Sequence, residues 1–121
     1  MRNAQHDKIN YVEFPAKDII ASKAFFNQAF NWQFTDYGPE YSAFSATSAG
    51  LEGGFYSADL SASTHSGSAL IVLFSADLAQ SQQKVEAAGG SIVKEIFPFP
   101  GGRRFHFTDP SGNEFAVWSN S

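Results

Sequence analysis

Among the ionisable side chains of this sequence, Glu13, Arg104 and His106 could together hold and move a proton. An imidazole titrates near neutrality, so a histidine oriented by a carboxylate can remove a proton next to a carbonyl group. A guanidinium can stabilise the enolate or carboxylate that results. Simpler interpretations stay open, because Glu13 and Arg104 could form a salt bridge and His106 could be a strand histidine with satisfied hydrogen bonds. Glu52 is interpreted as a residue of a strand ladder or of the surface.

The composition narrows the class of protein. Apolar residues make up 43% of the 121 residues and charged residues 17%, which favours one domain with a hydrophobic core and excludes a disordered chain. The net charge of −4 disfavours a nucleic-acid partner. No run approaches the roughly 18 apolar residues of a membrane span. Because cysteine is absent and residues 1–8 lack the apolar segment of a secretion signal, we expect a cytoplasmic protein.

The elements that must position the three side chains occur in two similar halves. Alternating polar and apolar residues predict a first strand, and Asp18 is expected to cap a helix that ends at Asn31. Three short strands follow, so that the strand, helix and strands of this half cover 8–14, 18–30, 32–37, 41–47 and 51–57. The second half repeats this order, with elements over 69–74, 78–88, 91–97, 103–108 and 114–118.

Two coincidences of spacing support an internal repeat. The second helix cap, Asp77, follows Asp18 by 59 residues, and the segment GLEGGFY at 50–56 aligns with GNEFAVW at 112–118 without a gap. Small polar residues between the halves indicate an exposed linker. The sequence therefore predicts one domain over 1–121, made of two βαβββ modules at 8–57 and 69–119.

The sequence resembles members of the vicinal oxygen chelate superfamily in its repeated modules and in the turn Asp109-Pro110-Ser111-Gly112-Asn113. That superfamily includes glyoxalase I, bleomycin resistance proteins, fosfomycin resistance enzymes and extradiol dioxygenases. The segment AFFNQAFNWQF at 24–34 is similar to the end of its first helix and its second strand. The resemblance implies an α+β fold in which two βαβββ modules form a curled mixed sheet, a cup with helices outside and the ligand within. It also implies association into a homodimer.

Metal-dependent members of the superfamily hold a divalent ion with four side chains, from the first and last strands of each module. Carried over by position, these ligands fall on Tyr11, Gly54, Leu70 and Ala116. A divalent cation needs imidazole or carboxylate, and a phenol with a pKa of about 10 is a poor substitute. We therefore expect no metal and no other cofactor. An unconventional metal site of Glu13, Glu52 and His106 stays open as an alternative.

The strand pattern and the resemblance together assign the side chains of the cup. The expected lining contains Glu13 and His106 as the acid/base candidates, with ligand contacts from Tyr11, Leu70, Val72, Phe74, Arg104, Ala116 and Trp118. The neighbouring Phe105 and Phe107 are expected to face the core. An apolar wall with a few polar groups is typical of a site for a small molecule.

The leading interpretation is a protein similar to glyoxalases and bleomycin resistance proteins that binds a small organic molecule without the usual divalent metal. A metal-independent lyase or isomerase, with Glu13 and His106 as acid and base, is the alternative. A third possibility is an accessory module whose sheet edge pairs with another chain.

Overall fold

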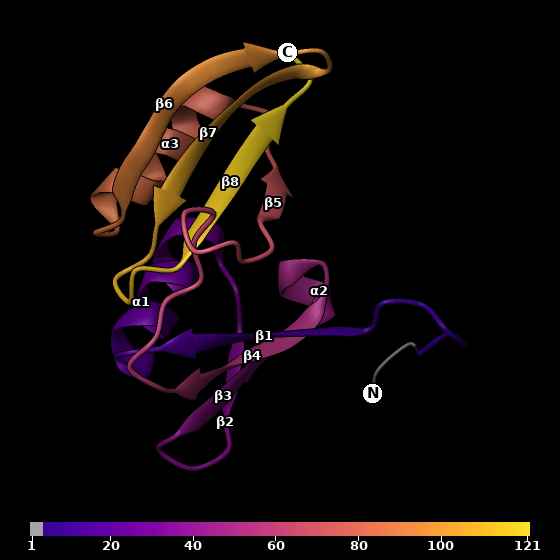
Figure 1. Cartoon of the computed structure of the whole chain (residues 1–121), viewed down its shortest axis with the longest axis vertical. Helices are drawn as coiled ribbons and strands as arrows, with labels where there is room; N and C mark the ends of the chain where they lie inside the picture. The colour runs from indigo at the N-terminus through magenta and orange to yellow at the C-terminus, as the bar shows by residue number, and fades with distance from the viewer. Residues whose placement is uncertain (1–3) are drawn as a thin grey trace.

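The computed structural model describes residues 4–121 and shows two four-stranded sheets, one from each half of the chain (Figure 1). The first three residues of the expected polar N-terminal segment lie outside this range. The first sheet has the order β1-β4-β3-β2 and the second β5-β8-β7-β6. The first half contains β1 (Tyr11–Ala16), α1 (Ile19–Phe30), β2 (Phe34–Asp36), β3 (Tyr41–Phe44), α2 (Ala46–Ala49) and β4 (Glu52–Ser57). The second half contains β5 (Ile71–Phe74), α3 (Leu78–Ala87), β6 (Ser91–Phe99), β7 (Gly102–Thr108) and β8 (Glu114–Ser119).

The predicted α+β fold of two βαβββ modules is confirmed. In each module the first strand runs parallel to the last, β1 to β4 and β5 to β8, and the remaining pairs are antiparallel. The first strand continues through Pro15, where the sequence had predicted its end. Because β1 lies at the edge of its sheet, it can include a residue without an N–H group. The short helix α2 was not predicted.

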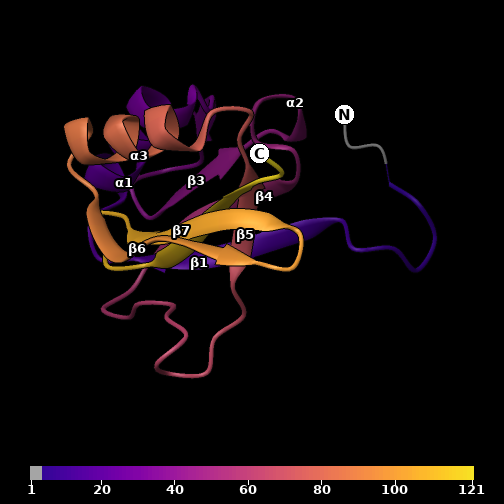
Figure 2. The ribbon, with the colours of Figure 1, turned by 90° about the horizontal axis from the view of Figure 1, so that it is seen from above.

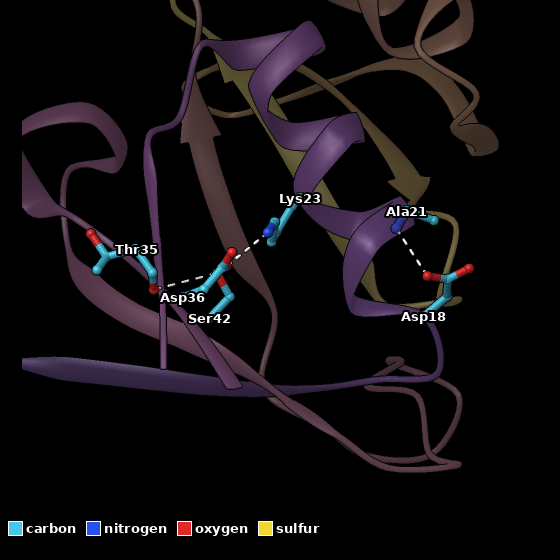
Figure 3. Close-up of polar contacts among 6 residues, drawn as sticks. All are labelled: Asp18, Ala21, Lys23, Thr35, Asp36 and Ser42. Atoms are coloured by element: carbon cyan, nitrogen blue, oxygen red, sulfur yellow. Dashed lines mark hydrogen bonds and ion pairs between the residues drawn. The ribbon is translucent and has the colours of Figure 1, made fainter. Parts of the chain in front are cut away.

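The predicted helix caps are confirmed. The Asp18 carboxylate accepts a hydrogen bond from the Ala21 N–H at 3.0 Å (Figure 3), and Asn31 adopts the left-handed conformation with φ of 60°. In the second module the Asp77 side chain accepts from the Gln80 N–H at 3.2 Å. These caps satisfy backbone groups that the helix ends leave unpaired, so each helix begins where the sequence indicates.

One surface ion pair joins α1 to the first sheet. Lys23 Nζ lies 2.7 Å from Asp36 Oδ1, and the Ser42 hydroxyl donates to the same oxygen at 2.7 Å (Figure 3). The hydrogen bonds from Lys23 and Ser42 lower the pKa of Asp36. The pair therefore orients α1 on β2 and β3, although its exposure limits its contribution to stability.

A single aromatic core spans both modules. Phe26 of α1 is fully buried, and its ring lies 5.6 Å from that of Phe55 in the first sheet and 5.0 Å from that of Phe115 in the second. Phe14 of β1 also contacts both rings, at 5.7 and 4.9 Å. Each module thus buries its apolar face against the other. Figure 2 shows α1 and α3 together on one side of the strands.

The turn at 109–113 connects the modules through buried polar groups. The Ser22 hydroxyl of α1 donates to the Asp109 carboxylate at 2.8 Å, and the Asp18 N–H donates to the Ser111 hydroxyl at 3.2 Å. Asn113 donates to the Pro15 carbonyl at 2.6 Å and accepts from the N–H of Ala62 at 2.8 Å. The sequence predicted this segment as a turn, and the structure shows that its side chains hold β1, α1 and the linker.

Among residues 4–121, no helix is long and apolar enough to cross a membrane.

Replacing Asn113 by alanine should destabilise the protein. The change leaves the Pro15 carbonyl and the Ala62 N–H without their partners, which should lower the free energy of unfolding by on the order of 2–4 kcal/mol. Urea unfolding measures the loss, with the exposed Asn120→Ala as the matched control. A loss below about 0.5 kcal/mol, the size of an ordinary surface change, would contradict the role given to this turn.

Candidate functional site

The open face of the second sheet, which we call the β7–β8 face, carries four of the predicted site residues. Arg104 lies opposite Trp118, and His106 opposite Ala116, in the antiparallel pair β7–β8. Their neighbours Phe105 and Phe107 are fully buried in the core, as predicted from strand alternation. The structure therefore brings Arg104, His106, Ala116 and Trp118 together.

Aromatic rings surround the polar groups of the β7–β8 face. The Arg104 guanidinium lies 5.4 Å from the centroid of the Phe97 ring and 5.6 Å from that of Phe99, both on β6. Trp118 contacts the rings of Phe74 and Phe99 at 5.1 and 6.3 Å. A guanidinium over aromatic faces is stabilised by cation–π attraction while its N–H groups stay available to a ligand.

The imidazole of His106 is held by a carboxylate that the sequence did not single out. His106 Nδ1 lies 2.8 Å from Glu114 Oε2, and both side chains are buried. The other oxygen, Glu114 Oε1, accepts from the Thr64 N–H at 2.8 Å and from the Thr64 hydroxyl at 2.9 Å. Burial raises the pKa of Glu114, but the hydrogen bonds from His106 and Thr64 outweigh burial and leave this pKa below its ordinary value. Glu114 is therefore an ionised acceptor at neutral pH.

The open face of the first sheet carries a second polar cluster, made of Tyr11, Tyr41 and Glu13. The Tyr41 hydroxyl donates to Glu13 Oε2 at 3.0 Å and is hydrogen-bonded to the Tyr11 hydroxyl. Burial, with the hydrogen bonds to Tyr11 and Glu13, raises the pKa of Tyr41. Glu13 and His106, expected as an acid/base pair, thus have different partners in the structure.

The positions that correspond to metal ligands do not fit a divalent ion. A Cβ at Gly54 would collide with the Tyr41 hydroxyl and lie 2.9 Å from the Ser42 carbonyl, so no larger side chain can project there. Leu70 and Ala116 offer only hydrocarbon. Within residues 4–121 no three His, Cys, Asp or Glu side chains gather at one point. Of the alternative set, Glu52 accepts from the N–H of Ala46 at the start of α2.

The remaining predicted residues lie along the edge of β5. Leu70, Val72 and Phe74 line an apolar cavity of about 670 Å³ whose other walls come from β1, α2 and the end of α1. Val72 is 41% exposed and Phe74 55% exposed. β1 and β5 are the outer strands of their sheets, so the cavity lies beside two strand edges that pair with no other strand of residues 4–121.

Three functional candidates were missed from the sequence. Glu114 shares the strand face of Ala116 and Trp118, so alternation along β8 could have found it. Tyr41 starts a predicted strand, but nothing in the sequence indicated that its hydroxyl reaches Glu13. Thr64 lies in the polar linker, where no periodic pattern exists to place a side chain.

The Glu114–His106 pair should make stability depend on pH. Folding lowers the pKa of the Glu114 carboxyl from its ordinary value of 4.5. Such a carboxylate stabilises the folded protein at pH values above 4.5, and this stabilisation is lost as the pH falls through the pKa of the folded state. The difference in unfolding free energy between the native protein and Glu114→Gln should therefore shrink from about pH 5 to about pH 3. Asp109, whose pKa is raised by burial, is present in both proteins and cancels. Urea unfolding at three pH values measures this, and a difference that is constant or grows toward low pH would contradict the assignment.

Comparison with known proteins places the fold. The solved structures similar to this chain include a glyoxalase-related enzyme from Fulvimarina pelagi, with 16% identity over 94% of this chain and 88% of that one and a TM-score of 0.77. Another is a fosfomycin resistance protein from Listeria monocytogenes in complex with Mn(II) and 1S,2S-dihydroxypropylphosphonic acid, with 18% identity, 97% and 93% coverage and a TM-score of 0.78. A third is lactoylglutathione lyase from Agrobacterium tumefaciens, with 16% identity, 95% coverage of both chains and a TM-score of 0.68.

These identities establish the shared fold alone. A search of curated proteins found no match. The family model described as glyoxalase/bleomycin resistance protein/dioxygenase superfamily matches residues 8–117, which is nearly the whole chain. The repeated modules, the 109–113 turn and this match agree, and the chain belongs to the glyoxalase/bleomycin resistance protein/dioxygenase superfamily.

Proposed function

We propose that this protein binds a small organic molecule on its β7–β8 face without the divalent metal used by other members of its superfamily. The observation that carries the proposal is the combination on this face of a guanidinium, a carboxylate-held imidazole and the ring of Trp118. Few polar groups among aromatic side chains fit an organic ligand with one charged end. The hydrocarbon at Leu70 and Ala116 and the Tyr41 hydroxyl over Gly54 support binding that needs no metal.

We also infer that the protein works as a homodimer. The outer strands β1 and β5 leave backbone groups that a neighbouring strand can pair, and the apolar side chains of Val72 and Phe74 beside them are largely exposed. A second copy would cover this edge and close the cavity of about 670 Å³.

A metal-independent lyase or isomerase is the second candidate function. The observation that favours it is the hydrogen bond between His106 and the buried Glu114, since an imidazole oriented by a carboxylate is the usual arrangement of a general base. In this mechanism His106 takes a proton from the substrate and Arg104 stabilises the resulting negative charge. Glu13, the other expected acid/base group, is hydrogen-bonded to Tyr41 on the first sheet and takes no part.

A ligand screen with two readouts separates these functions. Small organic acids should quench Trp118 fluorescence at saturation and be recovered unchanged, and Trp118→Phe should remove the response while the buried Trp32 still emits. Arg104→Gln should weaken the binding of acids at least tenfold, because it removes the charge that faces them. The exposed Arg103→Gln is the matched control.

Turnover of any compound in the screen would contradict binding alone. If that turnover then falls by about 10²-fold or more in His106→Ala, the lyase or isomerase function replaces binding as the better-supported function. The exposed His65→Ala is the control for that substitution.

A further inference from the structure

Two buried nitrogens on the β7–β8 face have no hydrogen-bond partner. Among the side chains of residues 4–121, Arg104 Nε and His106 Nε2 are the buried nitrogen or oxygen atoms without one. They belong to residues two apart on β7, so their side chains leave the same face about 7 Å apart. A buried polar group without a partner is unfavourable, and two such groups side by side indicate a ligand that completes both.

The contacts of Glu114 decide which hydrogen-bonding role each nitrogen of His106 has. An ionised carboxylate only accepts, so Nδ1, at 2.8 Å from Glu114 Oε2, must carry a hydrogen. In the neutral imidazole the lone pair then lies on Nε2, which can accept a hydrogen bond from a ligand. Thr64 fixes this arrangement, because its N–H and hydroxyl both donate to Glu114 Oε1.

Arg104 has the opposite role. Its Nε–H can only donate, and its guanidinium keeps a positive charge. Within the described chain the close contacts between a basic and an acidic side chain are those of His6 with Asp7, Lys23 with Asp36 and His106 with Glu114, so no carboxylate neutralises Arg104. The salt bridge considered between Glu13 and Arg104 is not formed. A ligand anion is the natural complement to this group.

An irregularity in β6 lies opposite both residues. The register between β6 and β7 shifts between Lys94 and Phe97, the two residues opposite His106 and Arg104. Such a bulge redirects side chains. The Phe97 ring lies 5.8 Å from the His106 ring and 5.4 Å from the Arg104 guanidinium. Phe97 therefore lies beside both side chains, where its ring can contact a ligand bound to them.

We propose that the β7–β8 face recognises an organic carboxylate that also carries a hydroxyl or N–H donor apart from the acid group, with the acid on Arg104 Nε–H and the donor on His106 Nε2. Glu114 and Thr64 are the positioning residues that hold the hydrogen on Nδ1. This inference rests on the proposed function, because it assumes that the β7–β8 face is the ligand site.

The hydrogen on His106 can be located in the protein alone. Long-range ¹H–¹⁵N spectra should show a protonated Nδ1 and a bare Nε2 in the native protein. In Glu114→Gln the Thr64 N–H should keep the amide oxygen on its side, so the amide nitrogen donates to Nδ1 and the hydrogen moves to Nε2. The exposed Glu95→Gln is the control and should leave the spectrum unchanged. A native protein whose Nε2 carries a hydrogen, alone or together with Nδ1, overturns the inference, whether or not the variant folds.

Three probes test the ligand class by calorimetry: 4-hydroxyphenylacetate, which has both groups; 4-methoxyphenylacetate, which lacks the donor; and 4-hydroxyphenethyl alcohol, which lacks the acid. The native protein should bind the first about tenfold more tightly than either of the others. Glu114→Gln should lose the preference for hydroxyl over methoxy and keep the preference for the acid.

The possible outcomes distinguish a failure of this inference about the ligand class from a failure of the proposed function. Binding of the two acids with equal affinity in the native protein overturns this inference and leaves the proposed function standing. No binding of any of the three probes, with no shift of Arg104 or Trp118 resonances, overturns both.

Discussion

The structure depends on the contact between the 109–113 turn and the start of α1. Neither four-stranded sheet can bury its aromatic face alone, because the ring of Phe26 must meet Phe55 on one side and Phe115 on the other. The bonds from Ser22 to Asp109 and from Asn113 to Pro15 fix the two sheets in the positions that allow this. Since these groups are buried, each must find its partner for the modules to pack.

The same constraint shapes the chemistry of the two open faces. With the core sides of both sheets turned toward α1, alternation leaves Tyr11 and Glu13 on one open face and Arg104 and His106 on the other. Tyr41 fills the space above Gly54 where a metal-dependent relative would place a ligand. The first face thus becomes a closed hydrogen-bonded cluster, whereas the second keeps nitrogens without partners inside the protein.

The sequence predicted the features that depend on residues close together in the chain. Caps at Asp18 and Asp77 and the alternation of Phe105 and Phe107 with their neighbours follow from local spacing, so the fold and the residues of the β7–β8 face could be predicted. The partner of His106 could not, since Thr64 reaches Glu114 from a linker without a periodic pattern. The interpretation of Glu13 as that partner assumed a contact between the sheets, whereas in the described structure Glu13 is bonded to Tyr41 and His106 to Glu114. Even the 109–113 turn was identified by its shape, while its role in joining the modules appears only in three dimensions.

We propose that the positions of Tyr11, Gly54, Leu70 and Ala116 provide a hydrogen-bonded cluster and an apolar wall in place of a metal site. The most direct test is the metal content of the purified protein, followed by titration with nickel, zinc, manganese and ferrous iron. The account predicts no stoichiometric metal and dissociation constants above about 1 mM, because two or three unconstrained ligands bind a divalent ion weakly. A metal held tightly at one equivalent per chain would contradict it and would mean that Glu13, Glu52 and His106 come together in a site that this arrangement does not provide.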